Sequence, residues 1–127
     1  MFTDSLTSSV SNISSDARVK DDVQDLTDGL NILKQLKPKT FKYKDDFRAA
    51  HNLTGESYTQ YGFIAQDLQA ISSDYVRTIP DPRDENENIL AIDAKFDNDL
   101  KGSMIKAIQE LSAKNDALEA RIAALEG

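Results

Sequence analysis

The chain has 127 residues, with 22 acidic and 15 basic side chains and a formal net charge of −7. That balance argues against a nucleic-acid partner or an anionic membrane surface, because both need a basic face on the protein. No cysteine is present, which excludes disulfides, thiol chemistry and Cys-ligated zinc. No apolar run approaches the roughly 18 residues that a membrane span needs.

The first third of the chain divides near Ser15. Residues 1–14 are rich in serine and threonine and nearly free of charge, which indicates a loop, a short strand or the end of an upstream segment. Charged residues follow at once, so this point is a candidate boundary. From Val19 onward, apolar residues recur at spacings of three and four and predict an amphipathic helix. Gly29 is a candidate break in that helix, and Pro38 ends it.

The middle of the chain predicts short elements of both kinds. Phe41 and Tyr43 alternate with lysines, as expected for a strand. The elements expected in chain order are a strand at 41–43, a polar loop at 45–57, a strand at 58–63, a helix at 64–71, a strand at 76–79, a turn at 80–88 and a strand at 89–92. The predicted fold class is therefore α+β: a small mixed domain of short strands and helices, followed by one long helix.

The long helix is expected over residues 94–126, with Asp93 as its N-cap. Its seam residues alternate in steps of three and four, which places them at the a and d positions of a heptad repeat. They are Ile108, Leu111, Asn115, Leu118, Ile122 and Leu125. Such a helix is about 50 Å long, too long to bury its apolar stripe against a small domain, so the stripe needs partner chains.

The flanking charges favour a parallel arrangement. Lys114 and Arg121 fall at g positions, and Glu119 and Glu126 fall at e positions, so both g-to-e pairs between neighbouring helices are opposite in sign. An antiparallel hairpin would lose this match. Asn115 in the seam costs stability but fixes the register. The heptads alone leave the number of helices open, since Ile at a with Leu at d favours a dimer.

Ser15 is a candidate nucleophile, and a serine hydroxyl needs a base beside it. The single histidine, His51, could complete a Ser–His–Asp triad, but it lies in a stretch that reads as a solvated loop. Lys20 is the nearest lysine, and Ser–Lys pairs are known hydrolytic dyads. Residues five apart in one helix are splayed by about 140°. A Ser15–Lys20 dyad therefore requires Ser15 to lie outside regular helix.

A lysine base must lose its proton, and an unperturbed lysine titrates near 10.4. Neighbouring carboxylates such as Asp16 oppose that loss, Arg18 favours it, and burial is the strongest means of bringing such a group to roughly 7–8. We therefore expect a reaction at Ser15 to depend on an assembly that encloses Lys20. The competing interpretation is structural: Ser15 caps a helix beside Asp16, and Lys20 is a surface charge.

No metal or cofactor site is predicted. The acidic run at 81–87 lacks the regular ligand spacing of a calcium loop, and no phosphate-binding Gly-x-x-x-x-Gly-Lys loop is present. Gly62 allows a tight turn or a close backbone approach. Phe63 and Ile64 after it are expected in the core, and Gln66 is expected to satisfy backbone groups rather than to act in catalysis.

Five sequence blocks, in a fixed order, are distributed along residues 15–127. They are Ser15-Asp16-Ala17-Arg18-Val19-Lys20, Leu36-Lys37-Pro38-Lys39-Thr40-Phe41-Lys42-Tyr43, Gly62-Phe63-Ile64-Ala65-Gln66, Asp74-Tyr75-Val76 and Ala107-Ile108-Gln109-Glu110-Leu111. In this order the blocks resemble the intramolecular chaperone domain of phage tailspikes and tail fibres, the endosialidase-type family of self-cleaving Ser–Lys peptidases. The chain departs from the family where an aromatic residue is frequent near the start of the last helix, since Asp93-Ala94-Lys95-Phe96 stands there instead.

The resemblance implies a homotrimer joined by a parallel trimeric coiled coil. It also implies autoproteolysis of the Ser14–Ser15 bond, with Ser15 as nucleophile and Lys20 as base. Residues 1–14 would then end the parent fibre, residues 15–93 would form the chaperone core, and residues 94–127 would form the coiled-coil helix. The expected partner is a β-structured upstream fibre domain, in the host cytoplasm during virion assembly, with release from the mature virion fibre.

Two alternatives remain at this point. One is a trimerisation cap that has the same fold but does not cleave. The other is a related self-cleaving domain that releases a membrane-tethered transcription factor.

Overall fold

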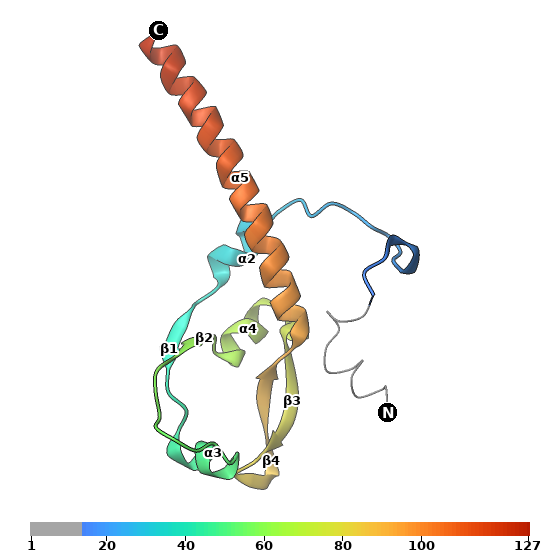
Figure 1. Cartoon of the computed structure of the whole chain (residues 1–127), viewed down its shortest axis with the longest axis vertical. Coiled ribbons are helices and arrows are strands. Elements are labelled where there is room, and N and C mark those ends of the chain that lie inside the picture. Colours follow the sequence, from blue (N-terminus) through green and yellow to red (C-terminus); the bar gives the residue numbers. More distant parts are fainter. Residues whose placement is uncertain (1–13) are drawn as a thin grey trace. The chain divides into compact units, whose positions relative to one another are not determined.

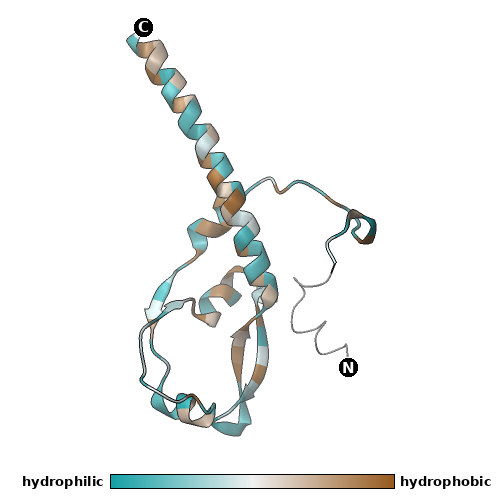
Figure 2. Cartoon of the chain, in the orientation of Figure 1, coloured by the Kyte–Doolittle hydropathy of each residue, from teal (hydrophilic) through white to brown (hydrophobic). Residues whose placement is uncertain are grey.

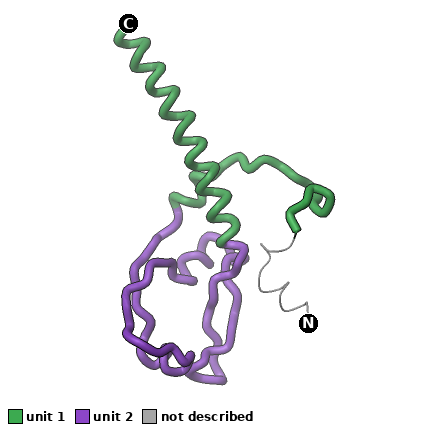
Figure 3. The backbone as a smooth tube through the Cα atoms, in the orientation of Figure 1, with its two compact units in different colours: residues 1–34, 97–127 green, residues 35–96 purple. Residues whose placement is uncertain are grey.

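The computed structural model describes residues 14–127, so the segment assigned to the parent fibre, residues 1–14, lies outside the described residues except for Ser14. The chain divides into two compact units (Figure 3). One contains residues 35–96, and the other contains residues 97–127 with the described part of residues 1–34. Among residues 14–127, no helix combines the length and apolar character that crossing a membrane requires.

The unit of residues 35–96 contains two antiparallel pairs of strands (Figure 1). Strand β1 (Lys39–Phe41) pairs with β2 (Gln60–Gly62), and β3 (Val76–Asp81) pairs with β4 (Asp84–Ile92). Helix α3 (Asp45–Ala50) connects the strands of the first pair, and α4 (Ala65–Ile71) with the 3-10 turn η3 (Ser73–Tyr75) connects the two pairs. The α+β class predicted from the sequence is confirmed.

The core of this unit is aromatic. Leu68, Tyr75 and Phe96 are almost fully buried, and the Phe96 ring meets Phe63 and Tyr75 edge-on at centroid distances of 5.1 and 5.2 Å. Such edge-to-face pairs stabilise a core beyond the area that they bury. Phe96 thus supplies the aromatic side chain that the start of the last helix was expected to lack.

Helix α5 runs from Ala94 to Glu126, as the sequence predicted. Asp93 is its cap: its carboxylate accepts a hydrogen bond from the Lys95 amide at 2.9 Å, and its own amide donates to the Tyr75 carbonyl at 2.8 Å. Hydrophobic residues alternate with hydrophilic residues along α5 (Figure 2).

Four elements predicted for residues 14–92 differ from the structure. The strand expected at 41–43 lies earlier, as β1, and ends at Phe41. Residues 45–50 form α3 rather than a loop, because two aspartates occupy its first turn, where the helix dipole favours negative charge. The turn expected at 80–88 spans only residues 82–83, and the polar residues 84–88 continue β4. The helix expected from Val19 is absent until α2 (Leu30–Gln35); only the 3-10 turn η2 (Ala17–Val19) precedes it.

The missing helix has a physical cause. Its expected apolar stripe stays open to solvent: Val19 is 65% exposed and Val23 is 73% exposed. Short helices in water need such a stripe to be buried, because propensity alone does not repay nucleation. Asp22 also adopts a left-handed backbone with φ of 51°, which interrupts any helix. We call residues 14–28, which contain only η2, the arm.

Candidate functional site

The structure brings Ser15 and Lys20 together. Ser15 lies in irregular backbone before η2, and Lys20 ends that turn with an extended backbone, its amide donating to the Ala17 carbonyl at 3.3 Å. The short turn reverses the chain, so the Lys20 Nζ donates a hydrogen bond to the Ser15 Oγ. Both residues are exposed. A hydroxyl and an amine thus lie in contact outside regular helix, as a Ser–Lys dyad requires.

Asp16, the residue after Ser15, is held by Arg18. Its carboxylate accepts hydrogen bonds from the Arg18 amide at 2.8 Å, from Nε at 3.1 Å and from Nη2 at 2.8 Å. These bonds hold the pKa of the Asp16 carboxyl below its usual value. Asp16 therefore caps η2. The competing interpretation, in which Ser15 is the helix cap, is wrong on this point. The Asp16 amide in turn donates to the Ser14 Oγ at 3.2 Å.

Gly29 joins the arm to α5. Its amide donates to Glu110 Oε1 at 2.6 Å, a contact between residues 81 positions apart. A Cβ added at Gly29 would lie 2.5 Å from the Ala107 nitrogen and closer still to the Ser103 carbonyl oxygen. Ser103 and Ala107 are each 2% exposed, so the two backbones pack directly against one another over small side chains. The sequence indicated only a possible helix break at this glycine.

The predicted seam of α5 is open to solvent. The exposed fractions are 64% for Ile108, 52% for Leu111, 54% for Leu118, 53% for Ile122 and 87% for Leu125. Asn115, the polar member of the seam, donates from Nδ2 to Glu119 Oε1 of the same helix at 3.3 Å. A single face of a helix that exposes this much contiguous apolar surface is typical of an interaction surface.

His51 ends α3 and stacks on the Phe47 ring at a centroid distance of 5.3 Å, with its side chain exposed. Its ring is used in packing, as for many surface histidines. Within residues 14–127, no three His, Cys, Asp or Glu side chains gather in a way that could hold a metal ion.

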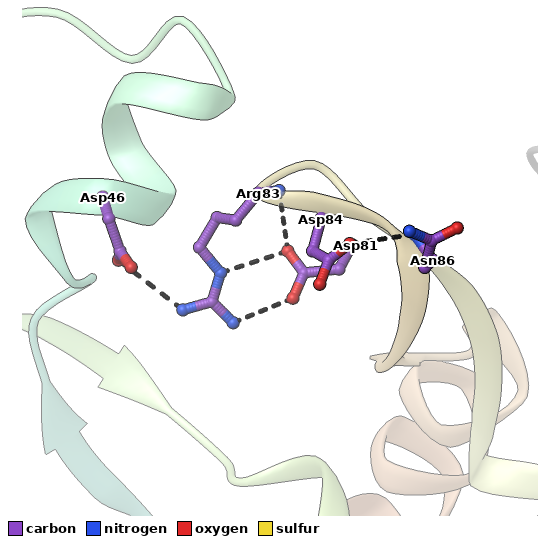
Figure 4. Close-up of polar contacts among 5 residues, drawn as sticks. All are labelled: Asp46, Asp81, Arg83, Asp84 and Asn86. Carbon is purple, nitrogen blue, oxygen red and sulfur yellow. Dashed lines mark hydrogen bonds and ion pairs between the residues drawn. The ribbon is translucent and has the colours of Figure 1, made fainter.

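A second Asp-x-Arg contact, which was not predicted from the sequence, lies at the turn between β3 and β4. The Asp81 carboxylate accepts from the Arg83 amide at 2.9 Å and from its side chain at 3.1 and 3.0 Å, as Asp16 does from Arg18 (Figure 4). These bonds lower the pKa of Asp81. Arg83 also reaches Asp46 of α3 at 3.5 Å and lies over the Phe47 ring, so it ties this hairpin to α3. The recurring Asp-x-Arg spacing was visible in the sequence.

Residues 15–77 match the family described as the chaperone of endosialidase. This segment of the chain therefore belongs to the endosialidase chaperone family. The match begins at Ser15 and includes Lys20, Gly29 and α4, while α5 lies beyond it. The resemblance inferred from the five blocks is thus confirmed.

A relative of this chaperone domain is a probable tail fiber protein of Escherichia phage Phieco32. It is 34% identical over 116 residues, which cover 86% of this chain. The chain spans only 14% of that relative's length. The family match and this relative support a chaperone role for the domain.

Proposed function

We propose that this chain is the releasable intramolecular chaperone of a phage tail fibre or spike. Three copies associate through parallel α5 helices, hold three parent chains in register, and then cleave the Ser14–Ser15 bond. The observation that carries the cleavage is the Lys20–Ser15 hydrogen bond, at the residue where the family match begins. The similarity to a probable tail fiber protein favours a fibre as the parent over a membrane-tethered transcription factor.

Chaperoning here means registration of chains. Non-local strand pairing is slow, because the entropy of closing long loops is lost before the contacts form. Three parent chains held side by side by their α5 helices would begin to pair at one end and in one register. An upstream β-structured fibre domain is the partner that gains from this, in the host cytoplasm during virion assembly. Release afterwards would leave the mature fibre unable to unzip by the route it took.

The proposed cleavage needs no group beyond the chain and water. Ser15 Oγ attacks the carbonyl carbon of Ser14 while Lys20 Nζ, as a neutral amine, takes the hydroxyl proton. The C–N bond of Ser14–Ser15 then breaks, the proton passes to the departing Ser15 amine, and an ester remains between the Ser14 acyl group and Ser15 Oγ. Water hydrolyses the ester, giving a carboxylate at Ser14 and restoring the Ser15 hydroxyl, so the released fragment begins at Ser15 with a free amine.

The Lys20 contact also indicates how the reaction would be controlled. In the described chain Lys20 Nζ donates to Ser15 Oγ and the lysine is exposed, whereas a general base has to accept the hydroxyl proton. Removal from water favours the neutral form of a lysine. We therefore infer that assembly activates cleavage by enclosing Lys20.

Activation by assembly predicts that the rate of cleavage depends on the seam of α5. The purified chain should yield, over time, a fragment that begins at Ser15 in an intact-mass spectrum. Leu118→Glu combined with Ile122→Glu places charges in the seam, so the chain should become monomeric and cleave about 100-fold more slowly. The matched control is Ala113→Glu with Ala120→Glu, which adds the same charges at exposed positions on the outer side of α5.

The control pair should assemble and cleave like the unchanged chain. A monomeric seam variant that cleaves at the full rate would contradict control by assembly. An assembled, unchanged chain that stays whole would instead identify a trimerisation cap without proteolysis.

Arg18 is expected to act as a positioning residue for the dyad. Its hydrogen bonds occupy the Asp16 carboxylate and lower the pKa of that group. Arg18→Gln frees a carboxylate next to Ser15, and a nearby anion favours the charged form of Lys20. Cleavage at neutral pH should therefore slow about tenfold, and its pH profile should move up by about one unit.

The control for this effect is Arg83→Gln, which breaks the same Asp-x-Arg contact at the β3–β4 turn. It should leave the pH profile of cleavage in place. A profile that does not move in Arg18→Gln either would mean that Asp16 has no influence on Lys20.

A further inference from the structure

The apolar face of α5 extends beyond the predicted seam, toward the start of the helix. Continuing the heptads backward places Met104 at d, Ile105 at e and Leu100 at g. Met104 is 47% exposed, Ile105 is 60% exposed and Leu100 is half-buried. At the same heptad positions farther along α5, the flanks carry Lys114, Arg121, Glu119 and Glu126 instead. Around Met104 the helix is therefore apolar at d, e and g, with the exposed Lys101 at a, whereas the later part carries charges at e and g and keeps its apolar residues at a and d.

The two flanks of this first part differ. On one flank, Gly29 crosses α5 over Ser103 and Ala107, at positions c and g, and is fixed there by Glu110. On the other flank, Ile105 at position e lies open. One side of the apolar face is thus covered by the chain's own backbone, and the other side has a large exposed side chain.

Parallel helices bring these two flanks together. The g residue of one helix faces the e residue of its neighbour five positions later in the sequence. Leu100 and Ile105 have this spacing, as do the oppositely charged pairs Lys114–Glu119 and Arg121–Glu126. The same register that matches the charges therefore sets Ile105 of one copy beside Leu100 of the next.

We propose that Ile105 of each copy packs against Leu100 and the Gly29 crossing of a second copy. This inference rests on the parallel self-association proposed above and adds a surface to it. The occupant is another copy of this chain, because the contact continues the seam and shares the register of the complementary charges. The residue that attaches the dyad-bearing arm to α5 thereby becomes part of the interface between copies.

The wider face also bears on the number of chains. A strict a/d stripe suits a narrow two-helix seam, whereas helices that bury a, d and a flanking position are typical of bundles. In a pair of helices, the outer sides of the e and g residues remain exposed to solvent. Apolar residues at both e and g are covered when each helix has a neighbour on either side. The first part of α5 thus favours three copies over two, from its own residues.

Cross-linking tests the contact directly. The chain has no cysteine, so Leu100→Cys with Ile105→Cys introduces the only thiols. Within one helix the two side chains point about 140° apart, so a short bis-maleimide reagent should join residue 100 of one copy to residue 105 of the next. We expect a covalent species of three times the chain mass on a denaturing gel.

The positive control is Lys114→Cys with Glu119→Cys, which has the same g-to-e relation in the charged part of α5. If this pair links chains while the 100/105 pair does not, the proposed contact is wrong and the parallel seam stands. If neither pair links chains, the parallel self-association itself is wrong. Covalent dimers without trimers from the 100/105 pair would overturn the three-copy arrangement.

Leu100 is half-buried, so a second variant tests the same contact while leaving Leu100 unchanged. Ile105→Glu replaces an exposed side chain and should leave the helix content measured by circular dichroism unchanged. Burying its charge against Leu100 should weaken self-association about tenfold or more in sedimentation experiments. Association at the strength of the unchanged chain would overturn the inference.

Discussion

Ser15→Ala should abolish the fragment that begins at residue 15. The hydroxyl is the group that Lys20 contacts, and an alanine leaves that position without a nucleophile. We expect the rate of cleavage to fall by about 10³-fold or more, because removal of the nucleophile or its base disables the pair as a unit. Intact-mass spectra over time, read for the mass of residues 15–127, measure this directly.

Two further variants separate the roles in that reaction. Lys20→Arg keeps a positive charge near Ser15 but cannot act as a base, since a guanidinium does not deprotonate in proteins; it should be as inactive as Lys20→Ala. Ser14→Ala removes only the hydroxyl that accepts from the Asp16 amide, so it should still be cleaved. A fragment beginning at residue 15 from Ser15→Ala would move the nucleophile elsewhere.

Gly29→Ala should have the largest effect on stability. An added Cβ meets the backbone of α5 at Ser103 and Ala107, and backbone atoms of a continuous helix cannot move aside. Forced overpacking of this kind costs about 2–3 kcal/mol. We expect a lower free energy of unfolding in denaturant titrations, faster proteolysis within the arm, and slower cleavage at Ser14–Ser15.

Gly102→Ala is the matched control, also a glycine of this unit. Its added Cβ would lie 3.8 Å from Leu26 Cδ2, an ordinary contact, so the change should be neutral or stabilising by about 0.5–1 kcal/mol, as for alanine in a helix. Equal effects at the two glycines would show that the close approach of Gly29 to α5 is not what holds the arm.

The parts of the fold that the sequence could predict share one property: their pattern is satisfied within the chain or by local caps. Asp93 and the periodicity after it define α5, because a cap and a long helical repeat are local signals. Helix α4 follows its spacing in the same way, whereas β1 ends at Phe41 and leaves Tyr43 of the expected alternation outside the strand.

The predictions that were wrong are those in which packing or contacts between distant residues override a local sequence pattern. The repeat from Val19 is helical in period, yet its first residues, Val19 and Val23, stay exposed, and Asp22 interrupts the helix with a left-handed backbone. The polar stretch from residue 45 was predicted to be a loop, although its first part forms α3. Phe47 of α3 stacks between Tyr43 and His51. The need for glycine at position 29 arises from the backbone of α5 at Ser103 and Ala107, far away along the chain, which no local signal contains.

The contact between Lys20 and Ser15 has one consequence for the direction of the reaction. A cut before Ser15 creates an α-amine, which carries a proton at neutral pH because such groups titrate near 8. That new ammonium would arise next to a lysine able to regain its own charge, and two like charges in contact repel. The peptide bond would therefore not re-form readily, because a protonated amine has no free electron pair with which to attack the Ser14 carboxylate.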